Sequence, residues 1–197
     1  MSAALGVGNA EPTVAFGVFY AKLLEEGGAW AADKFYIGKI SVGPSAGRDR
    51  SGSAAAVWEA QVVRCDRVDE INGENGGNGA KVCTGEARRA MMAAANVVGV
   101  KSGFTLGEKE TFYGTAVRPE EIRVGLEDAQ AKTDEALGGG RGGNYVYELT
   151  VRRSDNVPIW RITRDCGSGP DSDVCRDEER WTAEISAATG EIISRSR

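Results

Sequence analysis

The sequence of 197 residues contains no histidine. Histidine is the most common general base in enzymes and the most common side-chain metal ligand, so its absence excludes Ser–His–Asp and Cys–His catalytic groups. The four cysteines are not spaced as Cys-x-x-Cys, the arrangement typical of zinc and thiol-redox sites. We therefore expect a protein that is not an enzyme.

Long apolar runs and basic clusters are also absent. No apolar stretch of roughly 18 residues is present, so no membrane span is expected. The net charge is −5, and the Lys and Arg residues are interspersed with Asp and Glu. Because nucleic-acid binding depends on clustered cations, no nucleic-acid partner is expected.

The sequence does contain an internal repeat. Segments 57–65 and 159–166 both run from an apolar residue and a Trp through alternating residues to a Cys. A loop rich in Gly, Asn or Asp follows each segment and ends near a second Cys. Upstream, residues from Val14 onward align with residues from Val124 onward at a constant offset of 110 (124 minus 14). We infer a tandem duplication.

Each repeat predicts a helix followed by strands. Segments 14–24 and 120–137 carry apolar residues at helical spacing and run into glycines, which favours two helices. The later segments alternate with period two, which favours strands. Segment 86–98 is rich in Ala and Met, which favours a helix, but the repeat places a strand there. We predict an α+β fold of two units, 10–106 and 116–197, joined by a linker at 107–115. Each unit has one helix packed on an antiparallel four-stranded sheet.

The C-terminal unit resembles a PepSY domain and, more broadly, a cystatin-like module. The resemblance depends on Glu127-Asp128-Ala129 in the helix, on the strand 145–151, and on the closing segment 181–193 with its Thr189-Gly190-Glu191 turn. The N-terminal unit shares it only through the repeat and has Ala95 to Gly99 in place of that turn. The resemblance implies an extracytoplasmic binding or inhibitory module that has a protein partner and no catalysis of its own.

The cysteines fall into one pair per repeat, Cys65 with Cys83 and Cys166 with Cys175. Within each pair we expect the two residues on adjacent strands, close enough for a disulfide. Two disulfides would place the protein in an oxidising compartment, secreted, periplasmic or at the cell surface, with its signal peptide removed. Four reduced thiols, or attachment of a metal or covalent cofactor, are the alternatives.

Two sets of residues are candidates for binding. The acidic loops after the first cysteine of each pair could bind Ca²⁺, or they could be solvated hairpin loops. No other cofactor is expected. Trp58 and Trp160 recur in the repeat and are expected in the core, whereas Trp30 and Trp181 do not recur and are candidates for partner contact. The loop residues proposed for Ca²⁺ are Asp69, Glu70, Glu74, Asp171 and Asp173.

Two functions are consistent with these features. The first is a secreted or periplasmic, non-enzymatic binding or inhibitory module. The alternative is a structural or assembly protein, such as a surface, filament or virion component, that forms homo-oligomers through exposed sheet edges.

Overall fold

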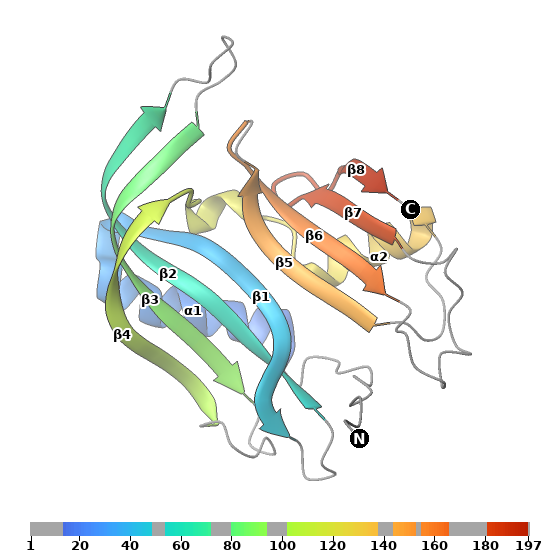
Figure 1. The fold of residues 1–197 in the computed structure, drawn as a ribbon, viewed down its shortest axis with the longest axis horizontal. Coiled ribbons are helices and arrows are strands. Elements are labelled where there is room, and N and C mark those ends of the chain that lie inside the picture. The colour runs from blue at the N-terminus through green and yellow to red at the C-terminus, as the bar shows by residue number, and fades with distance from the viewer. Residues whose placement is uncertain are drawn as a thin grey trace, which may run out of the picture.

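The computed structural model describes residues 14–48, 54–71, 80–93, 102–137, 144–152, 155–165 and 181–196. A helix and four strands are followed along the chain by a second helix and four more strands (Figure 1). The first set contains α1 (Phe16–Ala31), β1 (Phe35–Arg48), β2 (Ala54–Ile71), β3 (Ala80–Ala93) and β4 (Gly103–Gly114). The second contains α2 (Leu126–Leu137), β5 (Asn144–Arg152), β6 (Val157–Asp165), β7 (Trp181–Ser186) and β8 (Ile192–Ser196). Short 3-10 turns lie at Ala32–Lys34 and Pro119–Glu121.

The prediction of two units, each one helix on its own four-stranded sheet, is wrong. The eight described strands form one antiparallel sheet in the order β4-β3-β2-β1-β5-β6-β7-β8. Strand alternation shows which segments are strands but not which edges pair. Separate units would leave the edges of β1 and β5 unpaired, whereas in the single sheet three residue pairs join these edges.

Both helices cover the same face of this sheet. In Figure 1, α1 lies behind the first four strands and α2 behind β6 and β7. Buried residues from both helices and both halves of the sheet form one hydrophobic cluster. The Phe16 ring of α1 lies 5.4 Å from Trp58 and 5.2 Å from Trp160, measured between ring centroids. Phe16 therefore packs against both halves at once.

Trp58 and Trp160 are in the core, as the repeat predicted, with 1% and 0% of their surface exposed. The indole N–H of Trp58 donates to the carbonyl of Val14 at 2.7 Å. The indole N–H of Trp160 donates to the carbonyl of Val124 at 2.8 Å. The two acceptors are the residues aligned by the offset of 110. Such matching contacts favour the tandem duplication, which stays a prediction.

The joint between the halves has a symmetric register. Val42 lies beside Trp58, and Leu149 lies beside Trp160, so Val42 and Leu149 occupy equivalent places. If each residue of the joint is replaced by its equivalent in the other half, the same set of β1–β5 pairs results. A local two-fold axis therefore passes through the middle pair of the joint. The three pairs are Ile40–Leu149, Ser41–Glu148 and Val42–Tyr147.

The ends of the two helices differ from the sequence-based expectation. α1 continues through Gly27 and Gly28 to Ala31 instead of ending at the glycines. A Cβ on Gly27 would lie 2.7 Å from the Phe35 ring, so this glycine allows close approach to the sheet. α2 starts at Leu126 because the preceding residues bond elsewhere: the N–H groups of residues 123 and 124 both donate to the carbonyl of residue 187, each at 2.8 Å.

The first half of the sheet curls strongly. Gly114 at the end of β4 pairs with Cys83 on β3, and Val117 pairs with Ile37 on the far edge of β1. Three extended residues span about 10 Å, whereas four strand spacings in a flat sheet cover about 19 Å. The chain can therefore pass from the end of β4 to the edge of β1 only because the strands curve, as Figure 1 shows.

A second, smaller core lies on the sheet face opposite the helices. Neighbouring residues on a strand point to opposite faces, and Val62 belongs to the main cluster while Val63 belongs to the smaller one. Residues 86–93 are part of β3, so the strand predicted by the repeat is confirmed for the described residues. The small core consists of Val63, Cys65, Cys83, Ala87 and Phe112, with Tyr36 and Ala116 against it.

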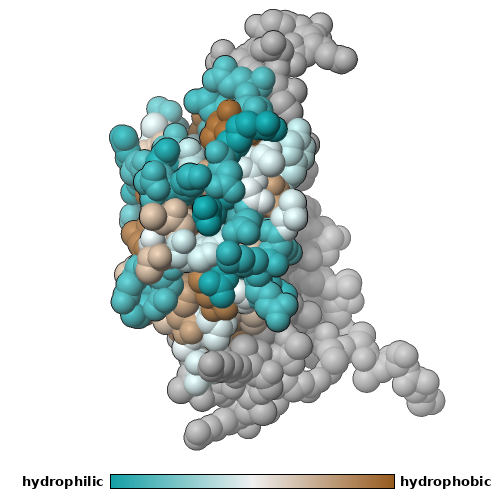
Figure 2. Space-filling model, turned by 90° about the vertical axis from the view of Figure 1, so that its left-hand side faces the viewer, coloured by the Kyte–Doolittle hydropathy of each residue, from teal (hydrophilic) through white to brown (hydrophobic). Residues whose placement is uncertain are grey.

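The edge strand β4 has a charged and irregular outer side. Residues 108–110, Glu-Lys-Glu, are exposed, and the pairing of β4 with β3 shifts register just before them. Arg88 fixes this shift by donating to the carbonyls of Leu106 at 3.2 Å and Gly107 at 2.6 Å. Figure 2 faces this side of the molecule, where hydrophilic side chains predominate and hydrophobic ones form small separate patches.

Candidate functional site

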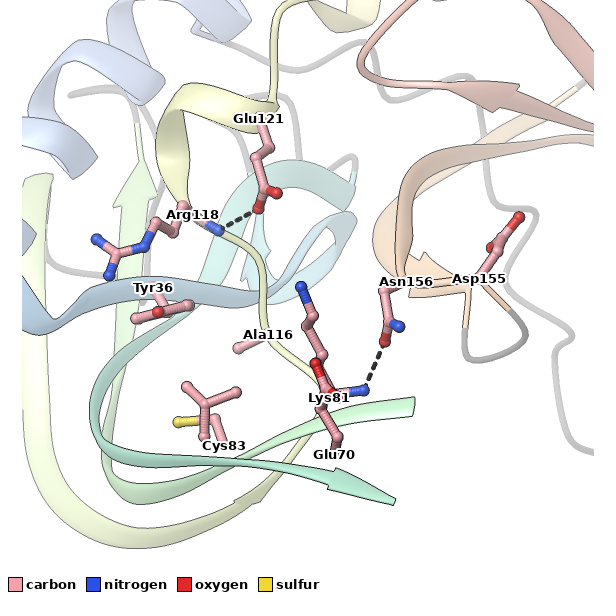
Figure 3. A pocket seen from close by; sticks show the side chains of 10 residues that line it. Tyr36, Glu70, Lys81, Cys83, Ala116, Arg118, Glu121, Asp155 and Asn156 are labelled. Atoms are coloured by element: carbon pink, nitrogen blue, oxygen red, sulfur yellow. Dashed lines mark hydrogen bonds between the residues drawn. The ribbon is translucent and has the colours of Figure 1, made fainter. Parts of the chain in front are cut away.

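A cavity of about 690 Å³ lies beside the small core. Three parts of the chain enclose it: the β2–β3 hairpin, the segment 116–121 and the turn between β5 and β6 (Figure 3). Both halves of the sheet therefore contribute to its wall. The cavity is lined by Tyr36, Val68, Glu70, Lys81, Cys83, Ala116, Arg118, Glu121, Asp155 and Asn156.

A disulfide between Cys65 and Cys83 supports the hairpin side of the cavity. It joins β2 to β3 next to a shift in their register, with the two Cα atoms 5.5 Å apart. The predicted pairing of these two cysteines is confirmed. The pairing predicted for Cys166 and Cys175 lies outside the described residues.

The segment 116–121 forms the second wall and is anchored through its backbone. Val117 and Ile37 exchange two N–H to carbonyl hydrogen bonds, of 2.8 and 2.9 Å. The guanidinium carbon of Arg118 lies 4.7 Å from the centroid of the Tyr36 ring, a cation–π arrangement. The Arg118 backbone N–H donates to the Glu121 carboxylate at 2.9 Å, as Figure 3 shows. This wall is therefore held at both ends.

The β5–β6 turn forms the third wall. Asn156 adopts a left-handed backbone conformation with φ of 59°, which Asn tolerates better than most residues. Its side-chain oxygen accepts the backbone N–H of Lys81 at 2.7 Å, so a residue of β3 is bonded to the second half (Figure 3). Arg152 donates from Nε to Asp155 at 2.9 Å, and this hydrogen bond holds the pKa of Asp155 below its usual value.

The cavity contains two cations that form no ion pair within 4.0 Å among the described residues, Lys81 and Arg118. Figure 3 shows the Lys81 side chain rising from β3 into the space between Glu121 and Asn156. Most of the carboxylates around the cavity are already bonded, and Glu70 is the exception among the described contacts. The site is thus polar, with both charge signs and no nucleophile–base pair among its lining residues.

Neither tryptophan proposed for partner contact lines the cavity. Trp30 is half-buried against the main core, and the guanidinium carbon of Arg88 lies 5.7 Å from its ring. Trp181 is 4% exposed and packs edge-on against Tyr145, with their centroids 6.0 Å apart. Its placement leaves little indole surface for a partner.

The residues proposed for Ca²⁺ are only partly described. Asp69 and Glu70 lie on β2, where Arg67 donates to Asp69 at 2.8 Å and Glu70 reaches the cavity. Glu74, Asp171 and Asp173 lie outside the described residues. Among those that are described, no three His, Cys, Asp or Glu residues gather into a metal-binding group. The Ca²⁺ site stays a prediction.

Most of the cavity residues carried no signal in the sequence. They come from four separate segments, and only Glu70 and Cys83 were singled out by their sequence pattern. The segment 116–118 lies near Tyr36 because Val117 pairs with Ile37 on the edge of β1. No local motif predicts this pairing.

No protein-family model matches the chain, and no curated protein or solved structure shows significant similarity to it. The resemblance to PepSY and cystatin-like modules therefore stays a prediction. In the part of the chain that the structure describes, no helix is long and apolar enough to cross a membrane.

Proposed function

We propose that the protein is a non-enzymatic binding module of an extracytoplasmic compartment, and that it holds a peptide segment of a protein partner in the cavity. The observation that carries this proposal is the cavity itself, about 690 Å³ and walled by both halves of the sheet. Its volume falls within the range of ligand-binding clefts. A module that binds in this way could inhibit its partner by occupying the bound segment.

The disulfide supports the proposed compartment. Cys65 and Cys83 are bonded and nearly fully buried, as in proteins of oxidising compartments. A secreted, a periplasmic and a cell-surface location would all provide an oxidising compartment.

The chemistry of the cavity favours binding over catalysis. Its sulfur atom is in a disulfide, its Tyr36 ring is beneath a guanidinium, and the Glu121 carboxylate accepts a backbone N–H. Nucleophilic catalysis needs a nucleophile and a base within hydrogen-bonding distance, and the lining residues offer no such pair.

Assembly through sheet edges has less support. The charged residues 108–110 and the register shift on β4 are features that oppose edge-to-edge pairing. The other edge strand, β8, spans only Ile192–Ser196.

Selection from a random peptide library tests the proposed function. The oxidised full-length protein is immobilised, and enriched peptides are measured against two variants, Ala116→Trp in the cavity wall and Ala136→Trp on the exposed surface of α2. We expect the peptides to bind wild type and Ala136→Trp alike and to bind Ala116→Trp at least about tenfold more weakly, because the indole fills the cavity.

Thermal unfolding of both variants checks that they are folded. If Ala116→Trp fails to fold, Ala116→Leu replaces it with a smaller obstruction. Failure to enrich any peptide, or equal binding by the cavity variant, would overturn the proposed function.

A further inference from the structure

The cavity combines an apolar surface with an unpaired cation, and the two together define a ligand. Val68 is 46% exposed and lies opposite Cys83 on β3. Cys83 beneath it is nearly fully buried, and the methyl group of Ala116 lines the same cavity. Covering this surface with an aliphatic side chain removes apolar area from water, which is favourable.

The first cation of the cavity is Lys81. Its backbone is held on two sides, by pairing with Glu70 on β2 and by the N–H bond to Asn156. Its side chain extends into the cavity (Figure 3), and no ion pair to it lies within 4.0 Å among the described residues. The backbone of Lys81 is thus held in place, and its exposed ammonium is available to a ligand.

The cavity wall carries charges of both signs, and Lys81 and Arg118 are the cations that a carboxylate of a ligand could meet. Glu121 accepts the N–H of Arg118, and Asp155 is bonded to Arg152. Arg118 adds a second cation on the Tyr36 ring. Glu70, opposite Lys81 on β2, is the third carboxylate of the wall, so a carboxylate of the ligand would share the Lys81 ammonium with it.

We propose that the cavity recognises a peptide segment in which a carboxylate side chain adjoins an aliphatic side chain. The carboxylate pairs with the Lys81 ammonium, and the aliphatic group covers Val68 and Ala116. This inference rests on the proposed function and specifies its ligand class.

Titration of the oxidised, isotope-labelled protein tests the inference. The probes are two acetylated, amidated tetrapeptides, Ala-Glu-Val-Ala and Ala-Gln-Val-Ala, and binding is followed by backbone amide shifts in NMR. Because charge-assisted hydrogen bonds are stronger than neutral ones, we expect the Glu peptide to bind at least about fivefold more tightly and to shift the amides of residues 68, 81 and 116.

Variants assign this preference to the lysine. Lys81→Gln is expected to remove the advantage of the Glu peptide, whereas Lys22→Gln, at an exposed lysine of α1 paired with Glu25, is expected to retain it. Equal affinity of wild type for the two peptides would overturn the inference, and so would retention of the preference in Lys81→Gln.

The failure of this inference is distinguishable from the failure of the proposed function. Peptides from the random library that depend on the cavity but lack acidic residues would leave the binding function in place and overturn only the ligand class. An absence of cavity-dependent peptides would overturn both.

Discussion

At the scale of single residues, the tryptophans show how a buried polar group is accommodated. The indole N–H groups of Trp58 and Trp160 each donate to a backbone carbonyl at the start of a helical segment. Trp181 is also buried, but its indole N–H has no hydrogen-bond partner among the described residues. Trp160 and Trp181 therefore form a matched pair with similar burial and different bonding.

Replacing each of these two tryptophans by Phe separates the hydrogen bond from the packing. Both variants lose indole volume, but only Trp160→Phe leaves the carbonyl of Val124 without its donor. Because Val124 is half-buried, loss of this hydrogen bond costs about 0.5–1.5 kcal/mol, and we expect Trp160→Phe to lose about that much more stability than Trp181→Phe. Urea unfolding followed by linear extrapolation measures the difference, and equal losses would contradict the argument.

At the scale of elements, the sequence predicts what depends on local periodicity. Residues 160–164 and 181–185 alternate between buried and half-buried positions, and the repeat corrects the helical composition of segment 86–93. Local sequence signals do not predict an element's end correctly where a tertiary contact determines it. Gly27 reads as a helix end, but its missing side chain instead leaves room for the Phe35 ring.

The β2–β3 hairpin is the element whose chemistry the sequence describes best. A double variant, Cys65→Ala with Cys83→Ala, removes the constraint on a loop with a sequence separation of 18 residues. We expect a loss of about 2–4 kcal/mol in the free energy of unfolding, measured by urea denaturation.

Peptide mapping of the unreduced, alkylated protein provides the independent check. It should recover a peptide linked through residues 65 and 83. Alkylation of both cysteines without prior reduction would contradict the disulfide. The double variant Cys166→Ala with Cys175→Ala serves as the comparison at the other pair.

At the scale of the whole molecule, the sequence could not predict how the halves meet. The joint depends on three residue pairs between β1 and β5 and on Phe16, which packs between two tryptophans far apart in the chain. The cavity follows from the same arrangement, because one of its walls belongs to the second half. The pairing of two strand edges and the meeting of distant segments leave no local pattern in the sequence.

Phe16→Ala tests whether this ring couples the halves. Because Phe16 is buried, we expect a loss of about 3–5 kcal/mol in stability, and we expect the indole N–H signals of Trp58 and Trp160 both to shift in NMR spectra. Val18→Ala, at a residue of the same helix that is 54% exposed, is expected to change stability by less than about 0.5 kcal/mol. A shift confined to one indole signal would show that the ring serves one half alone.

The short ladder between β1 and β5 has a mechanical consequence. Adjacent ladders contain ten pairs for β1–β2 and nine for β5–β6, against three at the centre. A force that separates the two halves must therefore rupture few hydrogen bonds before the tryptophan cluster opens, and each outer sheet remains intact. Under tension, we expect the molecule to part first along its midline, opening the cavity that spans the two halves.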